Sequence, residues 1–202
     1  KTLFDTIYHE HFSYLSLTSV EAVFKTAGLK VFDVEQLSTH GGSLRVYAQR
    51  AESTRFDTCE SVFRLRDEEA SLGVASPAFY AGFQERSDHT KDDLVRFLVD
   101  AKREGRQLVG YGAAAKGNTL LNYAGVRPDL MAYVVDNNPA KQGMYLPGSR
   151  IPIVDEQRIV DDPPDIVLVL PWNIRDEVAR RLGSLNGWSG TVVTAVPQLR
   201  VG

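Results

Sequence analysis

Four neighbouring residues near the start of the chain, Tyr8-His9-Glu10-His11, carry side chains that can exchange protons near neutral pH. The reference pKa of an imidazole is about 6.5, and a neighbouring carboxylate makes it a stronger base. An extended segment would place Tyr8 and Glu10 on one face and both histidines on the other, so a bend is needed to bring all four together. The sequence therefore favours proton transfer, with a His-x-His metal pair or ordinary hydrogen-bonded histidines as alternatives.

A second group of polar residues follows three apolar runs that are typical of buried parallel strands. In an open parallel sheet, ligands bind beyond the carboxyl ends of the strands. Glycines allow a tight turn and close approach of the backbone, and Lys116 adds a positive charge near the start of a helix. These segments are Gly110 to Thr119, Asp136 to Asn138 and Pro171 to Asn173. They predict a site for a phosphate-bearing ligand.

The glycines of the first segment also satisfy a dinucleotide-binding pattern. Gly110, Gly112 and Ala115 match G-x-G-x-x-G/A, and Asp136 follows Gly112 by 24 residues, near the spacing of an acid that binds ribose. NAD is therefore an alternative ligand, and glycines required only for packing are another. A Walker-type loop is not indicated, because Lys116 precedes a glycine and no Gly-Lys-Ser/Thr element follows.

From Arg106 onward, strand patterns alternate with helical patterns, which predicts a parallel sheet covered on both faces. We expect strands at Gln107–Tyr111, Met131–Val135, Ile166–Leu170 and Thr191–Val196. We expect helices after Lys116, near Asp155 and over Ile174–Leu185.

The preceding part of the chain has a different organisation. Thr18 and Glu21 form a capping-box pattern for a helix that Gly28 ends. Two strands follow, Leu29–Gln36 and Ser43–Arg50, joined by a turn that contains His40. Residues 53–105 are charged and helical, and Ser76-Pro77 resembles a cap with proline at the first helical position.

Composition limits the partners and the compartment. The chain has 202 residues and a net charge of −3 with no long basic run, so we expect neither nucleic acid nor a membrane as partner. The single cysteine, Cys59, is interpreted as an inert, partly buried thiol, which fits a cytoplasmic protein. The uncharged stretch Leu182–Leu199 contains glycines, Asn186 and Pro197, and we expect a helix end, a turn and a strand there.

Five segments together carry a family resemblance that runs through nearly the whole chain. They are FDTIYHEHFSY (residues 4–14), THGGSLR (39–45), GYGAAAKGNTLLN (110–122), VDNNPAKQG (135–143) and LPWN (170–173). In this order they resemble the S-adenosylmethionine-dependent sugar C-methyltransferases that act on nucleotide-linked ketodeoxysugars.

The resemblance implies a three-domain parent of which this chain is the C-terminal part. Residues 1–52 would be the tail of the methyl-donor (class I methyltransferase) domain, ending in a helix and a β-hairpin, and residues 53–105 a helical connector. Residues 106–202 would be a Rossmann-like α/β domain with a parallel sheet. S-adenosylmethionine would be bound mainly by the upstream domain and zinc by the N-terminal domain. We therefore expect no metal in this chain and no turnover by it alone.

The resemblance also implies roles for individual residues. His11 would be the base that removes a proton from the carbon next to the ketone, and Tyr8 and Glu10 would orient it or bind the sugar. The wall of the cleft for the nucleotide-linked ketodeoxysugar would include His40, Gly112, Lys116, Gly117, Asn118, Asp136 and Asn173. The remaining alternatives are an NAD-dependent oxidoreductase or NAD-binding module, and a stand-alone sensor of nucleotide sugars.

Overall fold

The computed structural model describes residues 2–185 and 187–202, and of His40 it describes the backbone alone. The chain divides into two compact units. The hairpin unit is Phe12–Gly82, and the sheet unit is formed by the segment up to His11 together with Phe83–Gly202.

The hairpin unit is a two-stranded antiparallel sheet with helices packed against it. Strands β1 (Leu29–Leu37) and β2 (Ser43–Arg50) pair along their whole length and are joined through the 3-10 turn Thr39–Gly41. Helices α1 (Leu17–Thr26) and α2 (Glu60–Leu72) contact β1, and the short α3 (Pro77–Tyr80) follows. The core residues of this unit are Leu17, Val20, Val31, Val34, Val62 and Leu65. The predicted helix and two strands, and the proline at the start of α3, are confirmed.

The predicted capping box of α1 is wrong. The N-cap is Ser16, whose hydroxyl accepts a hydrogen bond from the Ser19 amide, and Glu21 instead forms an ion pair with Arg66 at 2.6 Å. The first amides of the helix are capped from α2. The buried carboxylate of Glu69 accepts hydrogen bonds from the Leu17 amide at 2.7 Å, the Thr18 amide at 2.8 Å and the Thr18 hydroxyl at 2.6 Å. A capping acid that lies so far along the sequence leaves no local pattern.

The sheet unit contains a six-stranded sheet in the order β5-β4-β3-β6-β7-β8. Its strands are β3 (Leu108–Tyr111), β4 (Val134–Val135), β5 (Ile153–Val154), β6 (Ile166–Val169), β7 (Thr191–Thr194) and β8 (Arg200–Val201). All neighbouring pairs are parallel except β7 with β8. The expected Rossmann-like α/β arrangement with a mostly parallel sheet is therefore confirmed.

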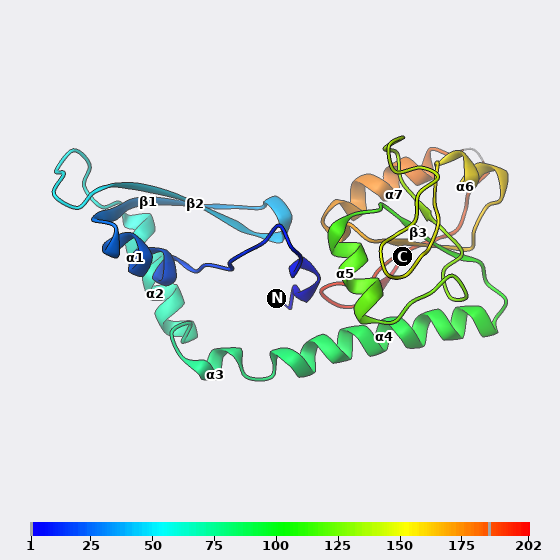
Figure 1. The fold of residues 1–202 in the computed structure, drawn as a ribbon, viewed down its shortest axis with the longest axis horizontal. Coiled ribbons are helices and arrows are strands. Elements are labelled where there is room, and N and C mark those ends of the chain that lie inside the picture. The colour runs from blue at the N-terminus through cyan, green and yellow to red at the C-terminus, as the bar shows by residue number, and fades with distance from the viewer. Residues whose placement is uncertain (1, 186) are drawn as a thin grey trace. The chain divides into compact units, whose positions relative to one another are not determined.

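Helices cover both faces of this sheet, because its central strands are apolar on both sides. Along β6, Ile166 and Leu168 lie in one core cluster and Val167 and Val169 in the other. The first cluster includes residues of α4 (Phe83–Arg103) and α5 (Ala115–Tyr123), and the second includes residues of α6 (Gln157–Asp161) and α7 (Arg175–Gly183). Figure 1 shows α4 and α5 on one side of β3, with α6 and α7 on the other.

Several element boundaries differ from the predictions at the edges of the sheet. The strands expected at Met131–Val135 and Thr191–Val196 are shorter, and β5 and the antiparallel β8 were not predicted. Two-residue edge strands show too little alternation to be recognised in a sequence. Cys59 is exposed, so the expected partial burial is wrong. None of the helices in the described residues is long and apolar enough to span a membrane.

The core of the sheet unit also contains residues from outside the range 106–202. Helix α4, within the expected connector, packs Leu94, Leu98 and Ala101 into the core of the sheet unit. Phe4, near the start of the chain, lies in the same core.

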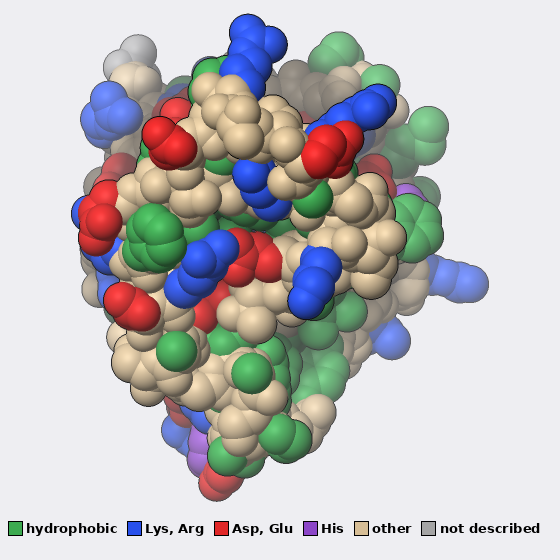
Figure 2. Space-filling view, turned by 90° about the vertical axis from the view of Figure 1, so that its left-hand side faces the viewer, with side chains coloured by type: hydrophobic (Ala, Val, Ile, Leu, Met, Phe, Trp, Pro, Cys, Tyr) green, Lys and Arg blue, Asp and Glu red, His purple; other side chains and the backbone are tan. Residues whose placement is uncertain are grey.

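On the face shown in Figure 2, acidic and basic side chains are interspersed, and neither sign of charge forms a separate patch.

Replacing Glu69 with alanine should destabilise the hairpin unit by about 2 kcal/mol, because it leaves two amides at the start of α1 without their acceptor. Urea denaturation followed by circular dichroism measures this loss. The matched control is Glu68→Ala, since Glu68 is exposed and its carboxylate accepts a long, 3.5 Å hydrogen bond from Gln36. Equal effects of the two changes would contradict the capping role of Glu69.

Candidate active site

The loops that follow β3 and β6 meet at the point where the strand order reverses. From β3 the chain continues to β4 and β5 on one side and then crosses to β6 and β7 on the other. Gly112 and Gly117 make this meeting possible: a Cβ at Gly112 would lie 2.6 Å from Cδ of Pro171, and one at Gly117 2.6 Å from Cβ of Leu170. In doubly wound folds, this reversal is where ligands bind.

The N-terminal segment of the chain lies at this same place. Its 3-10 turn, Phe4–Thr6, packs against α5, with Phe4 and Asp5 buried. The Asp5 carboxylate accepts a 2.7 Å hydrogen bond from Nε1 of Trp172, which lies in the loop after β6. The rings of Phe4 and Tyr123 lie 5.2 Å apart. The predicted catalytic residues Tyr8, Glu10 and His11 follow this turn in the sequence and are thereby attached to the sheet unit.

Residues 8–11 carry the side chains that the sequence predicts to move a proton, and they form a bend that is named after this prediction, the proton-transfer turn. The His11 amide donates to the Tyr8 carbonyl at 2.9 Å, and the rings of Tyr8 and His11 lie 4.2 Å apart. Nδ1 of His11 lies 2.8 Å from the carbonyl oxygen of Thr6. Because a carbonyl only accepts, Nδ1 carries the proton in the neutral ring and Nε2 carries the lone pair. His11 is exposed, so the basic nitrogen belongs to a side chain that a ligand can reach.

A pocket of about 470 Å³ is lined by the proton-transfer turn, the loops that follow β3 and β4, and the segment that leads into β5. Tyr8 and His9 line it together with Asn118 from the start of α5. The remaining lining residues are Ala113, Ala114, Ala115, Thr119, Ala140, Lys141, Met144, Tyr145, Leu146, Pro147 and Ile153. The structure therefore brings Tyr8 of the predicted catalytic set and Asn118 of the predicted substrate set into one pocket.

Lys141, Met144 and Tyr145 were not singled out in the sequence. They lie in the segment between β4 and β5, where Gly143 and Gly148 both have positive φ. Met144 and Tyr145 are exposed, with 59% and 65% of their surface accessible. The glycines and Pro147 are a turn signal in the sequence, but only the fold shows that this turn borders the pocket.

Asp136 holds the loop after β3 in place. One carboxylate oxygen accepts from the Ala113 amide at 2.7 Å and from Nζ of Lys141 at 3.2 Å, and the other accepts from the Asn138 amide at 2.8 Å. Nζ of Lys141 also donates to the Ala113 carbonyl at 2.9 Å. Asp136 is buried, so both of its oxygens are engaged within the protein.

Lys116 is buried beside the N-terminal segment. Its ammonium group donates to the Asn173 side-chain oxygen at 2.7 Å and lies 5.0 Å from the centre of the Trp172 ring. Burial lowers the pKa of Lys116, and the negative charge of Asp5 opposes this shift. Burial likewise raises the pKa of Asp5, and the Trp172 hydrogen bond and the charge of Lys116 oppose it.

The other predicted site residues do not line the main pocket. Gly112 and Gly117 lie in the contact between the loops, and Asn173 borders a second pocket described below. Glu10 is exposed in the proton-transfer turn. His40 belongs to the hairpin unit, and its side chain lies outside the described residues.

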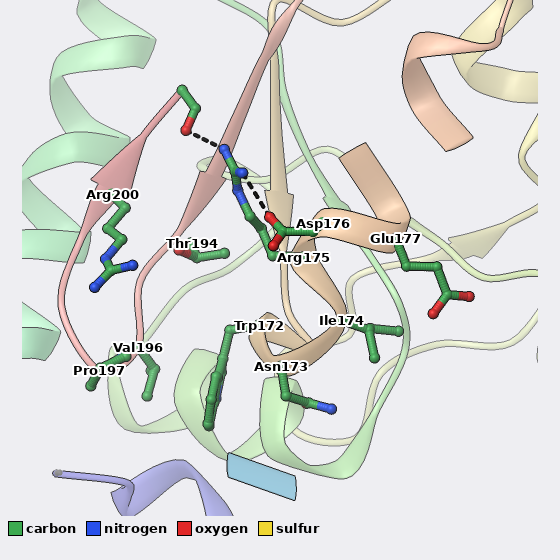
Figure 3. A pocket seen from close by; sticks show the side chains of 11 residues that line it. Trp172, Asn173, Ile174, Arg175, Asp176, Glu177, Thr194, Val196, Pro197 and Arg200 are labelled. Atoms are coloured by element: carbon green, nitrogen blue, oxygen red, sulfur yellow. Dashed lines mark hydrogen bonds and ion pairs between the residues drawn. The ribbon is translucent and has the colours of Figure 1, made fainter. Parts of the chain in front are cut away.

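The second pocket, of about 530 Å³, lies at the carboxyl ends of β6 and β7 (Figure 3). Arg175 and Arg200 line it together with Asp176 and Glu177, so that its charges balance. The Arg175 guanidinium donates to Asp176 at 2.9 Å and to the Gly202 carbonyl. None of the proton-transfer residues lines this pocket.

A polar network at the end of β3 joins the sheet to α7. The Tyr111 hydroxyl donates to Glu156 at 2.6 Å, and Arg181 binds the same carboxylate through two nitrogens at 2.6 and 2.7 Å. Burial, with the Glu156 hydrogen bond second, raises the pKa of Tyr111 to about 12. Within the described residues, no group of three or more His, Cys, Asp or Glu side chains is arranged to hold a metal ion.

Comparison with known proteins finds one matching family and a curated relative. The family described as C-methyltransferase C-terminal domain matches residues 38–197. C-methyltransferase NovU from Streptomyces niveus is 34% identical over 198 residues, which are 98% of this chain and 47% of that protein. The chain therefore spans about half the length of the curated relative that it matches.

Gly112→Ala should destabilise the sheet unit by about 2–4 kcal/mol, because the residue has a φ of +89° and a Cβ would collide with Pro171. Gly125→Ala is the matched control, since Gly125 has a φ of +68° but no atom within 4 Å of a Cβ. It should cost about 1 kcal/mol. Chemical denaturation of both variants separates backbone strain from the collision. A cost at Gly112 no larger than that at Gly125 would rule out the close loop contact.

Because the pKa of Tyr111 is raised, the free energy of unfolding should depend on pH in the alkaline range. The folded-state pKa of about 12 exceeds the usual value of 10.0. The protonated Tyr111 hydroxyl therefore stabilises the folded state fully below pH 10, and this stabilisation is lost as the pH rises through about 12. The loss should be about 2 kcal/mol. Urea denaturation at several alkaline pH values should show it as a difference between the wild type and Tyr111→Phe. Parallel curves for the two proteins would contradict the assignment.

Proposed function

Because the chain belongs to the C-methyltransferase C-terminal domain family, we propose that it supplies the proton-abstracting group and one wall of the substrate pocket of an S-adenosylmethionine-dependent methyltransferase. The proposed substrate is a nucleotide-linked ketodeoxysugar that is methylated on the carbon next to its ketone. The observation that carries this proposal is the pocket shared by the proton-transfer turn and the loop after β3.

The first step is removal of a proton from the carbon next to the ketone, which gives an enolate. Nε2 of His11 is the proposed acceptor, because Nδ1 holds its proton against the Thr6 carbonyl. The neighbouring ring of Tyr8 restricts the imidazole to one orientation, and Tyr8 also lines the pocket. Glu10 is proposed to orient the base or to bind the sugar.

S-adenosylmethionine, when bound by the rest of the methyltransferase, would supply the methyl group to the enolate carbon, with S-adenosylhomocysteine as the product that leaves. No described residue of this chain is assigned to bind it. Zinc does not fit the described residues, since they contain no suitable cluster of ligands.

The pocket has the chemistry that a sugar nucleotide requires. Met144, Tyr145 and Pro147 offer apolar and aromatic surface for a base or a deoxysugar, and Asn118 and Lys141 offer polar groups. No side chain caps the amino end of α5, which borders the pocket and favours an anion such as a diphosphate. Lys116, Gly117, Asp136 and Asn173 support this wall by holding the loops, while a direct contact is proposed for Asn118.

The part of the chain up to residue 52, which includes α1, β1 and β2, is proposed to be the end of the methyl-donor domain. Helix α1, strand β1 and strand β2 follow one another there, which is the terminal order expected from the family resemblance. The argument for NAD rested on the pattern Gly110, Gly112 and Ala115 and on Asp136 being available to a ribose. Because its oxygens are engaged by Ala113, Asn138 and Lys141, no observation favours a second function.

His11→Asn in the full-length protein should lower methyl transfer at least about 100-fold, because the amide has no basic nitrogen. Transfer of labelled methyl groups to the sugar nucleotide measures this. His89→Asn is the matched control, since His89 is an exposed histidine on α4 whose Nε2 lies 3.8 Å from the Glu85 carboxylate.

Binding separates a chemical defect from a structural one. Ligand-observed NMR should show that His11→Asn still binds thymidine or uridine diphosphate, and that Asn118→Ala binds it more weakly. Wild-type turnover by His11→Asn would remove His11 as the base. Binding of NAD without either diphosphate would overturn the proposed substrate class.

A further inference from the structure

Four polar or aromatic side chains form a cluster where the N-terminal segment meets α5 and the loop after β6. This cluster, here called the switch-point cluster, consists of the buried Asp5 and Lys116, the half-buried Trp172 and the exposed Asn173. Asp5 has 1% of its surface accessible and Lys116 has 7%. Trp172 joins the two charged groups, because its Nε1 donates to Asp5 and its ring lies 5.0 Å from the Lys116 ammonium. Asn173 accepts a hydrogen bond from that ammonium. None of these contacts belongs to the proton-transfer step itself.

Burying the charged groups of Asp5 and Lys116 costs free energy, although apolar packing already holds the N-terminal segment on the sheet unit. Phe4 buries its ring in the core of the sheet unit. Replacing buried charged groups by apolar ones is often neutral or stabilising, so net stability does not account for Asp5 and Lys116. What a buried hydrogen bond adds is a single permitted geometry, whereas an apolar contact tolerates sliding.

The position of Asp5 gives this geometry a consequence for the proton-transfer turn. The next residue is Thr6, whose carbonyl lies 2.8 Å from Nδ1 of His11. The Thr6 hydroxyl in turn donates to the Leu3 carbonyl at 2.7 Å. A displacement of Asp5 therefore moves the very carbonyl that determines which nitrogen of His11 carries the proton and where the ring points.

We propose that Asp5 and Trp172 are positioning residues for the proton-transfer turn: their buried hydrogen bond sets the Thr6 carbonyl and, through it, the orientation of His11. This inference rests on the proposed function of His11. Lys116 stabilises the Asp5 carboxylate by its charge, and Asn173 holds Lys116 in place. The predicted substrate residues Lys116 and Asn173 thus act on the chemistry through the N-terminal segment.

The test removes one hydrogen bond while keeping an aromatic ring. Trp172→Phe in the full-length protein should lower kcat about 10- to 100-fold with little change in KM, because the base is displaced while the pocket remains. Trp188→Phe is the matched control: it removes an indole that donates to the Pro164 carbonyl at 2.9 Å, and Trp188 lines neither the main pocket nor the second one. It should leave kcat unchanged.

Two spectroscopic readouts test the geometry directly. In the wild type and in Trp188→Phe, NMR should show nuclear Overhauser contacts between the rings of Tyr8 and His11, and Trp172→Phe should weaken them. Trp188→Phe also leaves Trp172 as the single tryptophan of the chain. In this chain, adding Asp5→Leu to Trp188→Phe should shift the Trp172 emission, because leucine cannot accept the indole hydrogen bond. In the full-length protein, Asp5→Leu should lower kcat about as much as Trp172→Phe.

The outcomes distinguish this inference from the function on which it rests. A wild-type kcat and intact ring contacts in Trp172→Phe, with an inactive His11→Asn, would overturn the positioning role alone. Full activity of His11→Asn would overturn the proposed function. Should Trp172→Phe fail to fold, Asp5→Leu gives the same test, because leucine is of similar size but has no oxygen to accept the indole hydrogen bond. Wild-type kcat in a folded Asp5→Leu would likewise overturn the inference.

Discussion

The indole of Trp172 donates its hydrogen bond to a carboxylate that is almost entirely removed from solvent. A buried carboxylate is costly unless hydrogen bonds and an opposite charge surround it. Asp5 can therefore occupy its place only when three segments meet there: the N-terminal segment, the loop after β6, and α5 with Lys116. The same requirement places the proton-transfer turn at the edge of the pocket, because that turn follows Asp5 directly along the chain.

Close packing at the strand reversal decides where a ligand can bind. Gly112 against Pro171 and Gly117 against Leu170 bring the loops after β3 and β6 so near that even a methyl group would not fit between them. The N-terminal segment covers the same place with Phe4 and Asp5. The pocket consequently opens toward β4 and β5, where Lys141 and the exposed Tyr145 line it. Gly112, one of the glycines in the dinucleotide-binding pattern, is thus also required for packing between the loops.

Much of the architecture could be predicted because it depends on local patterns. The run Ile166 to Leu170 is apolar at every position, which identifies a strand buried on both faces, and the structure packs its alternate residues into two cores. Helix α5 follows its glycine-rich loop, and α3 begins at the predicted proline. The family was also recognisable, because the order of five motifs along the chain is preserved in the sequence itself.

The partners of the polar side chains could not be predicted in this way. Glu69 caps a helix that begins 52 residues earlier, Asp136 binds the loop after β3, and Lys116 points toward Asp5 and Asn173 rather than lining the pocket. By itself the sequence determined the family, the alternation of strands and helices, and which residue types could move a proton. Only the tertiary structure decided which polar groups meet, because hydrogen bonds and charges act over a few ångströms between segments whose proximity is set by the packing of the whole sheet unit.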